Sequence, residues 1–375
     1  MIKSISQFKR ITCTIACLAT SSLLPAQVYA QSSSLPGSTV EAITIGNAQQ
    51  TQINSFIQSW TERALSGSSS DVKKAMEALV NPVHQRGVSI AFRQAYARSL
   101  VPLMDELEGQ DSVGSKLSAL RLAGALSTPD SASRVQKSLK DEDLGIQIFA
   151  VSRIQSIFSN TTKYSPAISS SEIDSLIGAL EKIAMENDVN RELLRSAVRA
   201  LIQGTTLTSK DMGNSRSTAI KALSNVVGNQ LRTLTVSDDP KFAQSLAIQA
   251  TSAITASILD ISSSTTSDAT REAVGLAGDT ISITLRRQFG KTLEPVSQRG
   301  LTIKSVRSAE SLLYFARRKH AEIAGDSQSS IRQTGFSDQL EAGDDRDFRN
   351  DASGLLGPGS DLIRKFNFAD ERFVR

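Results

Sequence analysis

The amino-acid sequence predicts an all-α protein, an irregular stack of helix pairs of the α-solenoid type with disordered termini. Three observations lead to this prediction. Four segments between residues 111 and 204 repeat one apolar spacing. Each segment is short and apolar on one face, so it needs neighbours to pack against. Helix-capping residues and helix breakers separate the segments.

The apolar residues of the four segments follow steps of three and four, which places them on one stripe of each helix. The stripes are Ala119, Leu122, Ala123 and Leu126; Ile146, Ala150, Ile154, Ile157 and Phe158; Ile173, Leu176, Ile177 and Leu180; and Leu194, Ala197, Val198 and Leu201. A short helix opens at Thr128-Pro129, and Ser169 with Glu172 fits a capping box.

Helical spacing also precedes and follows this block. Helices are expected over 53–64, 70–80 and 83–100, the last ending before Pro102. Further on they are expected near 219–227, 274–285 and 306–316. Residues 242–259 contain no charged side chain, which predicts a helix buried on most sides, with an oligomer interface as the alternative. The helical domain is predicted to span residues 41–322.

Two segments that begin with Asp carry a resemblance to a known superfamily. They run from Asp143 to Val151 and from Asp188 to Leu194, and both place apolar residues after the Asp. In this order the chain, over residues 112–205, resembles HEAT and armadillo helical repeats. If Ala119, Ala150 and Ala197 are equivalent, the spacings are 31 and 47 residues, so the period is irregular. The resemblance implies a curved stack of helix pairs that holds partner proteins.

The two ends differ in composition from the helical domain. Residues 1–30 have a basic start, an apolar stretch and small residues before a cleavage site after Ala30, which predicts a signal peptide and export to the periplasm or beyond. An uncleaved membrane anchor is the alternative. Residues 31–40 are predicted to form a flexible leader. Residues 323–375, rich in Gly, Asp, Ser and Arg, are predicted to form a mostly disordered acidic tail.

Removal of the signal peptide changes what the composition implies. Both cysteines, Cys13 and Cys17, leave with it, so no disulfide is expected. The formal net charge falls from +4 to +1, because three bases and no acids are lost. This near-neutral charge gives no indication of nucleic-acid binding. No segment other than the signal peptide is expected to cross a membrane.

The sequence contains few residues suited to catalysis. Its two histidines, His84 and His320, are far apart, and the common zinc, nucleotide and serine-hydrolase motifs are missing. Ser70 and Lys73 have a β-lactamase-like spacing, but Ser70 is better explained as a helix cap. The aspartates from Asp344 to Asp351 do not fit a calcium loop. We therefore expect no enzyme, no metal and no cofactor.

One stretch has a marked local charge. Residues 286–319 carry nine bases and two acids, and residues 321–375 carry eleven acids and seven bases. A solvated helix face explains such bases most simply. The functional alternative is an anion-binding face that the acidic tail covers or competes for. Its candidate residues are Arg286, Arg287, Lys291, Arg299, Lys304, Arg307, Arg317, Arg318 and Lys319.

A second candidate surface lies at the C-terminus. Leu362, Phe366 and Phe373 follow helical spacing and could dock in a groove of this chain or of a partner. Together these features predict an exported, non-enzymatic scaffold or adaptor that binds protein partners. The alternatives are a helical-toroid enzyme acting on an extracellular polysaccharide and a binder of anionic polymers or membranes through residues 286–320. The oligomeric state does not follow from the sequence.

Overall fold

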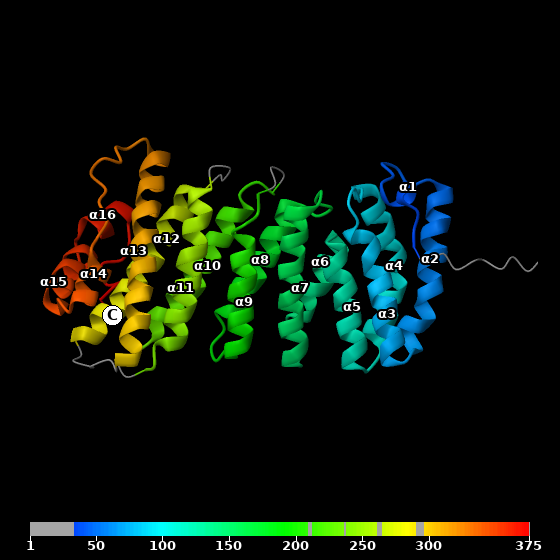
Figure 1. The fold of residues 1–375 in the computed structure, drawn as a ribbon, viewed down its shortest axis with the longest axis horizontal. Coiled ribbons are helices and arrows are strands. Elements are labelled where there is room, and N and C mark those ends of the chain that lie inside the picture. The colour runs from blue at the N-terminus through cyan, green and yellow to red at the C-terminus, as the bar shows by residue number, and fades with distance from the viewer. Residues whose placement is uncertain (1–33, 209–211, 236–237, 261–264, 290–295, 375) are drawn as a thin grey trace, which may run out of the picture. The chain divides into compact units, whose positions relative to one another are not determined.

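A computed structural model describes residues 34–374 except 209–211, 236–237, 261–264 and 290–295. The predicted signal peptide, both cysteines and Lys291 lie outside the described residues. In the part that is described the chain is all helical, and its helices pack on their neighbours in a stack of the kind predicted. Figure 1 shows the helices following one another in chain order.

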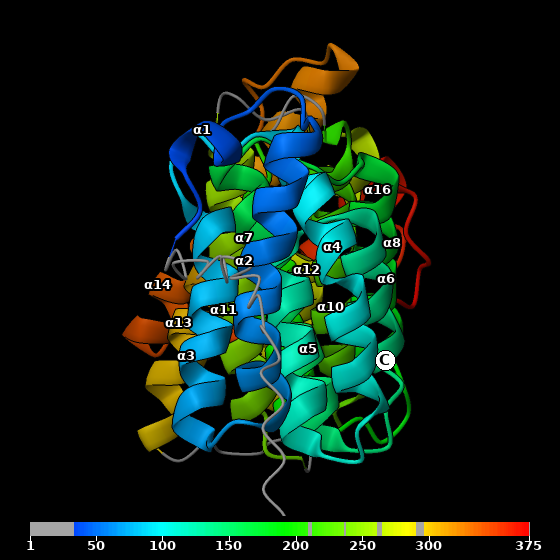
Figure 2. The same cartoon turned by 90° about the vertical axis from the view of Figure 1, so that its right-hand side faces the viewer.

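The stack has two layers of helices. In one layer α3 (Ser69–Val80), α5 (Val113–Leu126), α7 (Leu144–Lys163), α9 (Arg191–Gly204), α11 (Lys241–Leu259) and α13 (Val296–Ala324) pack in succession. The other layer holds α2 (Asn47–Ser66), α4 (Ile90–Gly109), α6 (Pro129–Ser138), α8 (Ser170–Ala184), α10 (Ser215–Thr233) and α12 (Ser267–Phe289). Consecutive helices also contact each other across the layers, which gives the helix pairs (Figure 2).

The predicted stripes form the core between these layers. Every residue of the four stripes is buried, as expected for helices with one apolar face. Ala119, Ala150 and Ala197 lie on α5, α7 and α9 of the same layer, so the irregular spacing of 31 and 47 residues describes neighbouring helices. The capping box at Ser169 and Glu172 is also present at the start of α8.

Four boundaries differ from the predictions. A short 3-10 helix, η1 (Asn81–His84), precedes α4. Pro102 lies inside α4, where it is exposed, so water can replace its missing backbone hydrogen bond. The leader is not flexible throughout, because α1 (Gly37–Val40) buries Thr39 and Val40. The N-cap of α3 is Ser68 and not Ser70 as predicted, whereas α6 does open at Thr128-Pro129 as expected.

The uncharged segment 242–259 lies on α11, of which Ala247, Ala250 and Ile254 are fully buried. No segment after the signal peptide was expected to be able to cross a membrane. By length and composition alone α11 could do so, and it is the one such helix among the described residues. Half of its apolar window is buried inside the protein, and buried core helices pass the same test.

The prediction of a mostly disordered tail is wrong. Residues after α13 form α14 (Phe336–Ala342), α15 (Asp345–Leu356) and α16 (Asp361–Phe366). Phe336 and Phe348 pack edge to face with ring centroids 5.8 Å apart, and both are buried. The Glu310 carboxylate of α13 accepts hydrogen bonds from the backbone N–H groups of Phe336 and Ser337 at 2.6 and 3.0 Å. This contact caps α14 and fixes the tail on α13.

Candidate functional site

The predicted basic segment does not form one surface. Arg286 donates a hydrogen bond to the Leu231 carbonyl at 3.1 Å, and the buried Arg287 donates to the Asp238 carbonyl at 2.8 Å. These two arginines hold neighbouring segments of this chain. Lys291 lies outside the described residues.

The bases of α13 fall into two groups. Arg299 lies 3.6 Å from Asp345, and Arg307 lies 2.6 Å from Glu341. The acidic tail therefore contacts part of the basic segment. Lys304 lines a shallow pocket of about 480 Å³ with Arg307, between α11 and α13. The second group lies at the other end of α13 and consists of Arg317, Arg318 and Lys319. Burial lowers the pKa of Arg317. Arg318 donates a hydrogen bond to the Tyr314 hydroxyl, and Lys319 forms an ion pair with Glu322.

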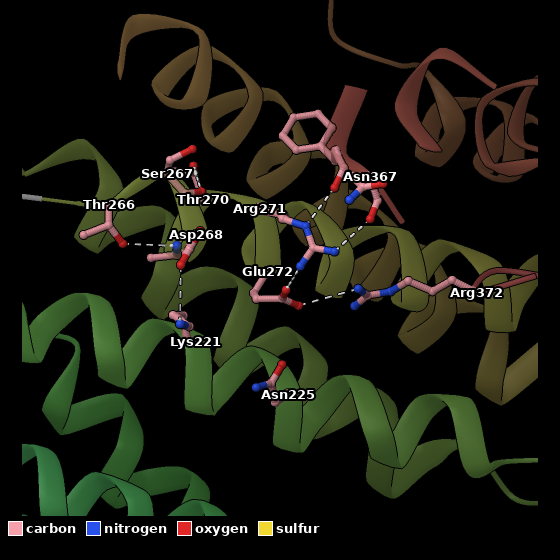
Figure 3. Close-up of polar contacts among 12 residues, drawn as sticks. Lys221, Asn225, Thr266, Ser267, Asp268, Thr270, Arg271, Glu272, Asn367 and Arg372 are labelled. Carbon is pink, nitrogen blue, oxygen red and sulfur yellow. Dashed lines mark hydrogen bonds and ion pairs between the residues drawn. The ribbon is translucent and has the colours of Figure 1, made fainter. Parts of the chain in front are cut away.

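The candidate partner-binding residues of the C-terminus are buried within this chain. Leu362, Phe366 and Phe373 are each at most 3 % exposed. Phe366 packs on the His320 ring with centroids 4.7 Å apart. In Figure 3, Arg271 of α12 donates to the backbone carbonyls of Phe366 and Asn367. The C-terminal segment therefore docks on its own chain.

A buried carboxylate anchors the same segment. Asp279 of α12 is fully buried and forms ion pairs with Arg232 and Arg372. Burial raises the pKa of the Asp279 carboxyl, and the two arginines oppose that rise. Arg372 also lies 3.5 Å from Glu272 (Figure 3). Removal of either arginine would leave the buried carboxylate incompletely paired.

His320 lies beside two hydroxyl groups but lacks the rest of a catalytic triad. Its Nδ1 atom is 3.0 Å from the Thr270 hydroxyl and 3.3 Å from that of Ser267. A nucleophile and base pair needs a third group that orients the imidazole. In the part of the chain that the structure describes, no carboxylate hydrogen-bonds to His320. Its position is explained by packing on Phe366.

A different site, not predicted from the sequence, lies on the layer formed by α5, α7 and α9. A groove of about 580 Å³ opens there, lined by cationic and polar side chains. We call it the cationic groove. Its lining residues are Val80, His84, Arg121, Ala125, Ser152, Arg153, Gln155, Ser156, Ser159, Asn160, Lys163 and Gln203. None of these is Asp or Glu.

The long helix α7 sets the geometry of the cationic groove. Arg153, Ser156, Asn160 and Lys163 follow steps of three and four, which places them along one face of α7. Ten residues of α-helix extend about 15 Å, so Arg153 and Lys163 mark two ends of the face. The residues between them carry hydroxyl and amide groups.

Each end of this face has a second basic side chain, Arg121 beside Arg153 and His84 beside Lys163, of which His84 is mostly neutral at pH 7 because its pKa is lowered. Burial lowers the pKa of Arg153, and the charge of Arg121 on α5 lowers it further. At the other end, burial lowers the pKa of His84, and the charges of Arg93 and Lys163 add to this effect. Burial is the larger cause of both shifts, and the neighbouring positive charges add to it because charges of like sign disfavour the protonated form.

The positive charge of the cationic groove is not neutralised by carboxylates. Among the described residues, Arg121, Arg153 and Lys163 form no ion pair with Asp or Glu. The buried Arg93 lies close to His84 and donates only to backbone carbonyls, those of Val83, Ala125 and Leu126. The Arg153 guanidinium donates to the neutral Ser152 hydroxyl at 3.2 Å, so an anion that entered the groove would meet cations that no carboxylate neutralises.

The groove is held in a fixed shape. The Arg153 guanidinium lies 4.5 Å from the Phe149 ring centroid, and its methylene groups pack on Gly124. The Asn160 amide donates to the carbonyls of Gly124 and Ala125 at the end of α5. These contacts join α5 to α7 and set the positions of the lining side chains before a ligand arrives.

The groove fits binding better than catalysis. His84 and Tyr164 stack with ring centroids 6.3 Å apart, but the Tyr164 hydroxyl already donates to the His84 carbonyl. Proton transfer by a His and Tyr pair would need that hydroxyl to face the substrate. In the ranges that the structure describes, no group of three or more His, Cys, Asp or Glu side chains could hold a metal ion.

Comparison of the chain with known protein families, curated proteins and solved structures finds no match.

Proposed function

We propose that the chain is an exported, non-enzymatic helical scaffold that binds an acidic segment of a partner protein in the cationic groove. The observation that carries the proposal is the meeting of Arg121, Arg153, Lys163 and His84 in a groove whose lining contains no carboxylate. Arg121 and Arg153 are half-buried and form no ion pair among the described residues, so an acidic partner would have to displace little water from them.

Two further considerations support this proposal. The resemblance of residues 112–205 to HEAT and armadillo repeats implies a protein that holds partners. The N-terminal 30 residues have the composition of a signal peptide, which indicates that partner and scaffold meet outside the cytoplasm. The layers of paired helices in the structure are compatible with such a solenoid.

A labelled glutamate peptide tests this function directly. Fluorescence anisotropy should detect binding of a ten-residue glutamate peptide to the full chain, and added salt should weaken it. The double variant Arg121→Gln, Arg153→Gln should bind at least about tenfold more weakly. A matched control with the same loss of charge is Lys137→Gln, Lys140→Gln, because both lysines are exposed on or just after α6 in the other layer. Equal weakening by both variants would refute the assignment to the groove.

A helical enzyme that acts on an extracellular anionic polysaccharide is the second candidate. The observation that favours it is His84, a possible general base, at one end of the cationic groove. Incubation with polyuronate should then release shortened chains, and His84→Gln should abolish the release. A binder of anionic surfaces through residues 286–320 would require release of the tail, because Asp338 and Glu341 pair with Arg307.

A further inference from the structure

We infer that the cationic groove selects an extended acidic peptide whose acidic residues are separated by about four positions. This inference rests on the proposed function and specifies its ligand. It depends on the distribution of charge along α7, where cations stand at both ends and uncharged donors and acceptors lie between.

The two cationic ends define a distance. One end holds Arg121 and Arg153, and the other holds Lys163 and His84. The ends are about 15 Å apart along the helix. In an extended peptide, residues four positions apart are separated by about 13 Å and point to the same side. Flexible lysine and glutamate side chains span the small difference. Two glutamates at this spacing can therefore reach both ends together.

The middle of the groove favours a peptide backbone over a sugar chain. Gln155 and Gln203 supply amides, and Ser156 and Ser159 supply hydroxyls. Such groups both donate and accept hydrogen bonds, as the N–H and C=O groups of an extended peptide require. A sugar chain could in addition stack its rings on the faces of aromatic side chains. Among the lining residues the sole ring is that of His84, which lies at one end.

Two labelled peptides of equal net charge test the inference. Both have eight residues built from Gly and Ser with two glutamates, which are four positions apart in the first peptide and adjacent in the second. The full chain should bind the first about fivefold more tightly, because this peptide forms one more ion pair. Arg153→Gln and Lys163→Gln should each remove the preference, since each removes the main cation of one end.

The control and the remaining outcomes separate this inference from the proposed function. Lys137→Gln, Lys140→Gln should retain the fivefold preference. Failure of both peptides and of the ten-residue glutamate peptide to bind would overturn the proposed function and this inference together. Equal binding of the two peptides, weakened by Arg153→Gln, would overturn the spacing alone. Tighter binding of an oligouronate, lost in Arg153→Gln, would also overturn the inference, because the ligand would then be a saccharide.

Discussion

Replacement of Gly278 by alanine should detach the C-terminal segment from α12. A Cβ atom at Gly278 would lie 2.5 Å from the ring of Phe373, which is 1 % exposed and cannot turn into solvent without leaving its site. Alanine in a helix is more favourable than glycine by about 0.5–1 kcal/mol. Overpacking a well-filled site costs about 1–3 kcal/mol. The variant should therefore lose up to about 2.5 kcal/mol of stability.

Gly178→Ala is the matched control. Gly178 is also in the interior of a helix, α8, and a Cβ atom there has no neighbour within 4 Å. This variant should gain about 0.5–1 kcal/mol of stability, because alanine has the higher helix propensity and here its Cβ atom meets no clash. The difference between the two variants therefore isolates the contact with Phe373.

Urea denaturation and amide hydrogen exchange measure the effect. Gly278→Ala should lower the free energy of unfolding and the protection of the α16 amides, while protection in α7 should stay unchanged. Phe373→Leu in the Gly278→Ala background should restore part of the loss, because the smaller side chain relieves the clash. Equal stability of Gly278→Ala and Gly178→Ala, with α16 still protected, would refute the packing described here.

Three other changes have defined outcomes. Arg372→Met should cost up to about 3 kcal/mol in urea denaturation, because it leaves the buried Asp279 with Arg232 alone; unchanged stability would contradict a structural role for the ion pair. Glu310→Gln should lower α14 protection in hydrogen exchange, because the carboxylate that caps α14 loses its charge; unchanged protection would exclude this capping role. In the free protein, burial and the charges of Arg93 and Lys163 lower the pKa of His84. A bound acidic peptide should raise this pKa, so that below pH 6.5 His84 is protonated more readily in the complex than in the free protein. Anisotropy should therefore show tighter binding at about pH 5.5 than at 7.5, and His84→Gln should show no such change.

The apolar stripes could be predicted from the sequence because each depends on residue spacing within a single helix. Ala119, Ala150 and Ala197 each belong to a stripe that one helix presents on one face, and any packing partner buries it. The helical domain and its irregular period follow from such stripes alone.

The folded tail could not be predicted from composition. Its Gly, Asp and Ser residues conceal a few well-placed apolar side chains, such as Phe336 and Phe348, that contact each other only after the tail folds onto α13. A composition rich in small and polar residues predicts disorder, because it gives no sign of a few apolar residues that meet in the folded chain. Here Glu310, which belongs to the preceding helix, supplies the cap that α14 lacks locally.

The cationic groove depends on tertiary structure. His84, Arg121 and Lys163 belong to three different helices, and none stands in a basic run of the sequence. The only local signal was the spacing of Arg153, Ser156, Asn160 and Lys163 along α7. The basic run from Arg286 to Lys319 is a stronger signal in the sequence, yet several of its side chains hold other parts of the chain.

The contact between Asp279 and Arg372 joins residues 93 positions apart, so it sets an order on biosynthesis. While α12 emerges from a ribosome or a translocation channel, its central carboxylate has Arg232 as a partner but must wait for Arg372. Until then the surface of α12 at Gly275 and Gly278, on which Arg372 and Phe373 pack, is uncovered, and the Asp279 carboxylate beside it is exposed to water. This end of the stack can therefore close only after the last residues of the chain have been synthesised.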